Sequence, residues 1–101
     1  IFVDDVLAGW ATTIAHHADV GGLVPCSNSI GATEIYQEGL RLPFLKLYSR
    51  EHENSDLFTI IESNVRVPEL VLGDLRAQVA ACRAGERGLR ELAQRYGVHQ
   101  V

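Results

Sequence analysis

The first fifteen residues alternate between apolar and small or polar side chains, a pattern that predicts β-structure. Ile1–Val3 is typical of the end of a strand, Asp4-Asp5 of a tight turn and Val6–Ala15 of a second strand, so a hairpin is predicted. One face of the second strand carries the large side chains of Trp10 and Ile14. The opposite face carries mostly small side chains, which would allow another element to approach closely.

The middle of the chain has no sustained period and predicts loops and turns. Residues 21–31 combine glycines, a proline and short polar side chains, which is typical of a loop. Residues 32–36 are too few to decide between a short strand and a helical turn. An extended segment is predicted over residues 40–48. The polar and charged stretch 49–54 is predicted to be an exposed loop.

From residue 55 onward the apolar positions follow a helical period. Ser55 is predicted to be the N-cap of a first helix, in which Leu57, Ile61 and Val65 recur at intervals of four. Pro68 cannot continue this helix, but it suits the first turn of a second one. The sequence therefore predicts two consecutive helices.

The second helix is predicted to carry a heptad-like apolar seam. The seam residues are Leu72, Leu75, Val79, Cys82 and Leu89. Gly85 and Gly88 each weaken the helix by about 1 kcal/mol relative to alanine, which makes a bend or break there plausible. Gly97 follows Tyr96 and predicts the end of the helix.

Together these patterns predict an α+β fold. An N-terminal β-hairpin and loops, residues 1–48, precede a helical half over residues 55–97. A chain of 101 residues has the size of one small domain. It contains no Met and begins in what reads as the middle of a strand. We therefore expect residues 1–101 to be a single fragment of a larger domain.

Composition and charge exclude several classes of partner. The net charge is −4 and no basic stripe occurs, so nucleic acid is not an expected partner. No apolar run approaches the roughly 18 residues of a membrane span, so no membrane partner is expected. The two cysteines have no C-x-x-C spacing and are expected to be reduced thiols of a cytoplasmic protein.

The chemistry is concentrated in residues 16–22, His-His-Ala-Asp-Val-Gly-Gly. His16 and Asp19 are three residues apart and could converge if the chain bends at the two glycines, which would form one edge of a divalent-metal or acid/base site. Strand alternation points His16 and His17 in opposite directions, so both cannot bind one ion without a twist. Adjacent histidines are more often an ordinary surface or packed pair, and no zinc-site spacing is present.

Two further pairs of polar residues allow both a functional and an ordinary role. Glu38 and Arg41 flank Gly39 and could grip a substrate, although a surface ion pair is the default interpretation. Asn64 and Arg66 flank the break between the two predicted helices, where helix capping is expected.

Several long stretches resemble the hydantoinase B/oxoprolinase family in the order in which they occur. They are residues 16–22 with Pro25, residues 32–43 (ATEIYQEGLRLP), residues 64–66 (NVR), residues 73–78 (GDLRAQ) and residues 95–97 (RYG). The resemblance covers nearly the whole chain. The family includes B subunits of ATP-dependent hydantoinases and 5-oxoprolinases, and related subunits of acetone and acetophenone carboxylases.

The resemblance implies a division of labour between two subunits or domains. A hydantoinase A/oxoprolinase-type partner uses ATP and Mg²⁺ to activate a small cyclic amide, and the B part completes ring opening, or carboxylation in the carboxylase branch. In this scheme His16 is the expected ligand of a divalent metal, whether Mn, Zn or Fe. Asp19 would orient His16 or join the site directly, and Glu38 and Arg41 would be catalytic groups on the substrate side.

The chain also departs from the family pattern. Cys26 stands where the family has a glycine after the proline, and Asn28 stands where Met is usual. An upstream segment expected to supply the other metal ligands is absent, so we expect the isolated fragment to be inactive and to work within a hetero-oligomer.

Two functional hypotheses remain open at this point. In the first, the chain is part of the B subunit of an ATP-dependent amidohydrolase that opens hydantoin, 5-oxoproline or a related cyclic amide. In the second, it is a structural and assembly module of a related metal-dependent ketone carboxylase. It would then form subunit contacts through the apolar seam and have no chemistry of its own.

Overall fold

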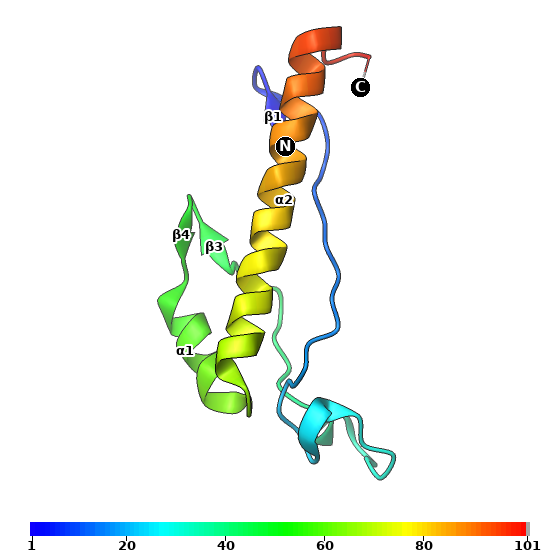
Figure 1. Ribbon diagram of the computed structural model, residues 1–101, viewed down its shortest axis with the longest axis vertical. Helices are drawn as coiled ribbons and strands as arrows, with labels where there is room; N and C mark the ends of the chain where they lie inside the picture. The colour runs from blue at the N-terminus through cyan, green and yellow to red at the C-terminus, as the bar shows by residue number, and fades with distance from the viewer. Residues whose placement is uncertain (101) are drawn as a thin grey trace. The chain divides into compact units, whose positions relative to one another are not determined.

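The computed structural model describes residues 1–100 and divides into two units. Ile1–Ala15 and Arg76–Val101 make up the terminal unit, and His16–Leu75 makes up the central unit (Figure 1). Two short antiparallel hairpins and two α-helices confirm the predicted α+β class. Within the described residues, neither helix combines the length and the apolar character needed to cross a membrane.

The terminal unit begins with the predicted hairpin, which is much shorter than expected. β1 (Phe2–Val3) pairs with β2 (Val6–Leu7) across Asp4 and Asp5, whose φ angles of 49° and 62° suit the tight turns that join hairpin strands. The prediction that the second strand continues to Ala15 is wrong. Beyond Leu7, the backbone N–H groups of Ala8 and Gly9 both donate to the carbonyl oxygen of Ile1. The pairing of the two strands ends there.

The small-residue face predicted for the N-terminal segment is confirmed by its contacts with α2 (Pro68–Tyr96). A Cβ atom on Gly9 would lie 3.3 Å from the side chain of Leu89, and the Cys82 thiol lies 3.7 Å from the carbonyl oxygen of Ala11. The segment after β2 runs alongside the C-terminal part of the helix in Figure 1. Its larger side chains, Trp10 and Ile14, remain exposed.

α2 begins at Pro68 and ends before Gly97, as predicted, but it has no break at Gly85 or Gly88. Two glycine penalties of about 1 kcal/mol each are small beside the many backbone hydrogen bonds of a 29-residue helix. Gly97 has a φ angle of 89° and donates its N–H to the carbonyl of Ala93, an arrangement that closes helix ends.

The central unit contains a second hairpin that the sequence did not reveal. β3 (Tyr48–Ser49) pairs with β4 (His52–Glu53), and the turn between them has positive φ angles at Arg50 and Glu51. The Tyr48 hydroxyl donates to the carboxylate of Glu53, directly across the pair. Residues 49–54 were therefore wrongly predicted to be a simple loop. Their polar composition concealed a tight turn flanked by very short strands.

Helical turns connect the remaining segments of the central unit. Residues 32–36, left undecided by the sequence, lead into a 3₁₀ turn, η2 (Ile35–Gln37), and η1 (Pro25–Ser27) lies in the predicted loop. The N-cap of α1 (Ser55–Asn64) is Asn54 and not Ser55 as predicted, because the Asn54 side chain accepts the N–H of Leu57.

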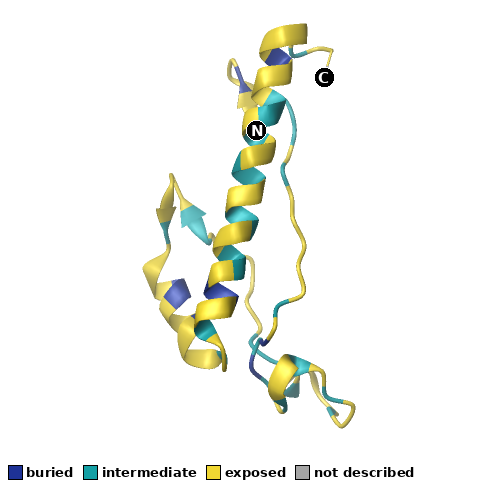
Figure 2. Ribbon diagram, in the orientation of Figure 1, coloured by how far each residue is buried: buried dark blue, intermediate teal, exposed yellow. Residues whose placement is uncertain are grey.

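The core of the central unit lies between α1 and the beginning of α2, where Figure 2 shows buried residues. Its buried members are Leu57, Phe58, Ile61, Val71 and Leu72. Partly buried side chains from the extended segment, including Leu40 and Leu47, pack against this cluster, and the rings of Tyr48 and Phe58 meet edge to face at 6.0 Å. The core thus fixes the junction of the two helices next to the chain after residue 40.

Candidate functional site in the central unit

Asp19 is a buried carboxylate held by three hydrogen bonds. Only 2% of the residue is exposed. One carboxylate oxygen, Oδ2, accepts the backbone N–H groups of Gly21 at 3.0 Å and Arg66 at 2.8 Å. The other, Oδ1, accepts Nη1 of the Arg66 guanidinium at 2.9 Å. A buried charge needs this kind of compensation, and these contacts hold the loop of residues 19–22 against the junction of the two helices.

The guanidinium of Arg66 extends this contact to the rest of the loop. Its Nη2 donates to the carbonyl oxygen of Gly22 at 2.7 Å, and its Nη1 also donates to that of Val24 at 3.1 Å. The planar fork of an arginine suits such multiple bonds. The prediction that Arg66 caps a helix is therefore wrong, because both its backbone and its side chain bind the 19–24 loop. Asn64 does act locally, donating its Nδ2 to the carbonyl of Ile60 within the last turn of α1.

Three glycines allow two chain segments to cross in close contact; we call this the glycine crossing. Gly21, Gly22 and Gly39 have φ angles of 82°, 86° and 137°, values that favour glycine. A Cβ atom at any of them would lie 2.6 Å from a backbone oxygen of another segment. Those oxygens belong to Asn64, Gln37 and Val20, respectively. The two glycines after Asp19 are thus required by backbone packing.

Backbone hydrogen bonds tie the crossing together. Leu40 donates to the carbonyl oxygen of Val20 at 2.7 Å, and Leu23 donates to that of Gln37 at 2.8 Å. The hydroxyl of Ser27 bridges the loop internally: it accepts the N–H of Val20 and donates to the carbonyl of Gly21. These bonds hold residues 20–23 and 37–40 in one fixed arrangement.

The hydrogen bonds to Asp19 have an electrostatic consequence. They lower the pKa of this carboxyl from 3.8 to about 2, mainly through the backbone N–H of Arg66, with smaller contributions from Gly21 and the guanidinium. Burial acts in the opposite direction and raises the pKa, but the hydrogen bonds dominate.

We expect this lowered pKa to make stability depend on acid pH. Because the folded pKa lies below the unfolded one, ionised Asp19 stabilises the fold fully above pH 3.8, and this contribution is lost as the pH falls toward about 2. Melting temperatures measured from about pH 5 down to pH 2 should fall more steeply for the unmodified protein than for Asp19→Asn. Equal slopes would contradict the assignment of Asp19 as a charged, hydrogen-bonded group.

The two adjacent histidines have different environments, as strand alternation suggests. His16 is exposed, whereas only 16% of the His17 side chain is accessible. His17 lines a small cavity of about 120 Å³ among apolar side chains that include Leu40, Ile61 and Val71. Its buried Nδ1 has no hydrogen-bond partner within residues 1–100, and the nearest carboxylate oxygen, on Asp74, is 3.9 Å away.

No metal-binding cluster is formed within the described part of the chain. Among residues 1–100, no three His, Cys, Asp or Glu side chains lie close enough together to hold an ion. The contacts of Asp19 go to Arg66 and Gly21, so they give this carboxylate a structural role. The metal-ligand role of His16 and the catalytic role of Asp19 stay predictions; a metal held by three such side chains would need at least one of them from outside residues 1–100.

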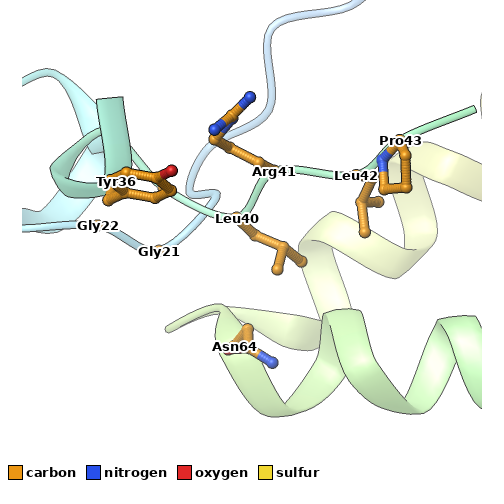
Figure 3. Close-up of a pocket in the computed structure, with 9 residues that line it drawn as sticks. Gly21, Gly22, Tyr36, Leu40, Arg41, Leu42, Pro43 and Asn64 are labelled. Carbon is orange, nitrogen blue, oxygen red and sulfur yellow. The ribbon is translucent and has the colours of Figure 1, made fainter. Parts of the chain in front are cut away.

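A larger cavity of about 630 Å³ opens beside the glycine crossing (Figure 3). All three crossing glycines line it, together with Tyr36, Leu40, Arg41, Leu42, Pro43 and Asn64. Of the two substrate-side residues predicted from sequence, the structure places Arg41 in the wall of this cavity. Glu38 is exposed and does not line it, and no ion pair joins the two within residues 1–100.

Comparison with known proteins identifies the family. The model of the hydantoinase B/oxoprolinase family matches residues 1–101, the whole chain. The chain belongs to this family. It is 42% identical to the beta subunit of caprolactamase from Pseudomonas jessenii and 38% identical to the B subunit of a putative D-/L-hydantoinase from Pseudomonas sp. (strain NS671). Both alignments cover 100% of this chain and 17% of the relative.

A more distant relative is a subunit of a carboxylase. The chain is 22% identical to the delta subunit of acetophenone carboxylase from Aromatoleum aromaticum, over 100% of this chain and 15% of that relative. The chain therefore spans less than a fifth of these relatives. No solved structure gives a significant match.

Sequence reasoning did not identify Arg66 as the partner of Asp19 or Tyr36 as a residue of the cavity wall. Both lie in stretches on which the family resemblance was based, but neither was assigned to the site. A signal for Arg66 was available. Asp19 is a lone carboxylate in a loop of apolar residues and glycines, so its burial requires a cationic or N–H partner elsewhere in the chain.

Proposed function

We propose that this chain is part of the B-type subunit of an ATP-dependent amidohydrolase that opens hydantoin, 5-oxoproline or a related cyclic amide. Its identity of 42% and 38% to the subunits named for caprolactamase and hydantoinase, against 22% for the carboxylase subunit, carries this proposal. A hydantoinase A/oxoprolinase-type partner would use ATP and Mg²⁺ to activate the substrate. The relatives are named as beta and B subunits, which supports a hetero-oligomer with such a partner.

In this proposal the fixed loop positions His16 as one ligand of a divalent metal. The observation that fits is geometric: His16 is exposed, and it lies three residues before a carboxylate that is anchored by Arg66. When bound, the metal would polarise the amide carbonyl or lower the pKa of a bound water. Asp19 would keep the loop in place, and the wall of the larger cavity would contact the substrate through Arg41.

The alternative, an assembly module of a ketone carboxylase, has less support. It requires the apolar seam of α2 to be available for subunit contacts. Within the terminal unit, Cys82 and Leu89 of this seam already contact Ala11 and Gly9 of the same chain. Part of the seam is thus occupied by the N-terminal segment.

A histidine replacement in the full-length protein and its partner tests the proposed function. His16→Ala should lower bound divalent metal and reduce ATP-dependent hydrolysis of cyclic amides by 10-fold or more, since losing even a residue that orients a metal ligand costs roughly 10- to 100-fold. His52→Ala is the matched control, because His52 is also exposed but lies in β4. Metal analysis and an assay of ring opening would provide the measurements.

Two results would contradict the proposal. Unchanged metal content and turnover in His16→Ala would show that this imidazole does not hold the metal. ATP-dependent carboxylation of a ketone by the full-length complex, without hydrolysis of any cyclic amide tested, would favour the carboxylase alternative.

A further inference from the structure

Arg41 presents a charged group whose hydrogen-bonding capacity is unused within the described chain. Its guanidinium carbon lies 5.5 Å from the centre of the Tyr36 ring, a distance typical of a cation–π contact. No carboxylate or carbonyl within residues 1–100 accepts its N–H groups. The ring thus holds the guanidinium in place while no group of residues 1–100 occupies its donors.

The surroundings of Arg41 suit a small molecule. A volume of about 630 Å³ lies within the roughly 300–1,000 Å³ of ordinary small-molecule sites. Figure 3 shows Tyr36 and Arg41 on the same stretch of chain, with Leu42 and Pro43 following and Asn64 across from Leu40. In Figure 3 the side chains of Leu40 and Leu42 extend to the other side of the chain from the Arg41 guanidinium, so the Tyr36 ring is the surface that lies beside this group. The glycine crossing holds the backbone of this wall.

The charges of the cavity indicate which anion it would take. Arg41 is the only cationic residue among those that line it. A phosphate or nucleotide generally needs several donors or a glycine-rich phosphate loop with a lysine, and the lining contains no lysine. One guanidinium matches one carboxylate, which it can bind through two parallel hydrogen bonds.

From these observations we propose that Arg41 and Tyr36 form a carboxylate subsite for a small organic acid. The inference rests on the proposed function for the identity of that acid. The carboxylate could belong to the ring substrate itself, as in 5-oxoproline. It could also be the group that forms when water cleaves the ring C–N bond, leaving a carboxylate on carbon and an amine on nitrogen, as in glutamate.

Calorimetric titration of the full-length protein tests the subsite without ATP or turnover. The informative ligands are 5-oxoproline, its analogue 2-pyrrolidinone, which lacks the carboxylate, and glutamate. Arg41→Gln should weaken binding of a carboxylate ligand by roughly 10- to 100-fold, the effect of losing a charge-assisted hydrogen bond, and leave 2-pyrrolidinone binding unchanged. Arg41→Lys should have an intermediate effect, because it keeps the charge but loses the planar fork.

Arg87→Gln serves as the matched control, since Arg87 is exposed on α2. Its binding of all three ligands should equal that of the unmodified protein. A selective loss for 5-oxoproline would assign the subsite to the substrate, and a selective loss for glutamate would assign it to the product. Equal losses for 2-pyrrolidinone and the carboxylates, no loss for either carboxylate, or no carboxylate binding by the unmodified protein would overturn the proposal.

This experiment can fail independently of the proposed function. If the complex hydrolyses cyclic amides but Arg41→Gln binds both carboxylates normally, only the subsite is wrong. If carboxylate binding depends on Arg41 but no hydrolysis of a cyclic amide is found, the subsite stands and the hydrolase assignment fails.

Discussion

Replacing Gly39 with alanine is expected to destabilise the protein by about 1–3 kcal/mol from backbone strain alone. Its φ angle of 137° is one that side-chain-bearing residues rarely adopt. The added Cβ would also lie 2.6 Å from the carbonyl oxygen of Val20 and 2.8 Å from that residue's side chain, so the two segments of the crossing would have to separate. Thermal or denaturant unfolding of the full-length protein would measure the effect.

The opposite result is expected for Gly88→Ala, which is the matched control. Gly88 lies inside α2, and no atom would come within 4 Å of an added Cβ. Alanine is the better helix former by about 0.8–1 kcal/mol, so this variant should be slightly more stable. A Gly39→Ala variant as stable as the unmodified protein would contradict the crossing described here.

Replacing Arg66 with alanine is expected to be the second large change. It removes guanidinium bonds to Asp19, Gly22 and Val24 together, and it leaves a buried carboxylate with its backbone donors only. Hydrogen bonds to charged groups each contribute about 1.5–3 kcal/mol, and the partial exposure of the Arg66 side chain favours the lower end. The loss should appear as a lower melting temperature and as weaker protection of the 19–24 loop from hydrogen exchange.

Arg87→Ala provides the comparison, because it removes an exposed arginine from α2 and should change stability by at most about 0.5 kcal/mol. If Arg66→Ala and Arg87→Ala melted at the same temperature, Arg66 would not hold the loop.

Local patterns predicted the elements whose causes are local. The Asp4-Asp5 turn, the start of α2 at Pro68 and its end at Gly97 each follow from the backbone preferences of one or two residues, and all three are confirmed. Errors appeared where two local signals competed. Asn54 rather than Ser55 caps α1, although both side chains could do so, and a 29-residue helix is continuous despite its glycines.

These local patterns could not predict contacts between residues that are far apart in the sequence. Asp19 and Arg66 are separated by 47 positions, and no periodicity links them. The sequence stretches 16–22 and 32–43 drew attention to the correct part of the chain, because both contribute to the glycine crossing. The sequence suggested that the glycines permit a bend toward a metal, but the structure shows that they permit two backbones to touch. Likewise, the alternation of side chains over residues 8–15 predicted which face of the segment is small. It could not show whether a neighbouring strand pairs with this segment.

Asp19 and Arg66 act together to hold the 19–24 loop, which begins three residues after His16. A double-mutant cycle in the full-length protein tests it most directly, using Asp19→Asn, Arg66→Gln and the double variant, with Asp56→Asn and Arg66→Gln as a control pair. We expect the double variant to lose clearly less stability than the sum of the two single losses, because the Asp19–Arg66 side-chain bond is counted in both, whereas the losses of the control pair should add. Additive losses for Asp19 and Arg66 would contradict it.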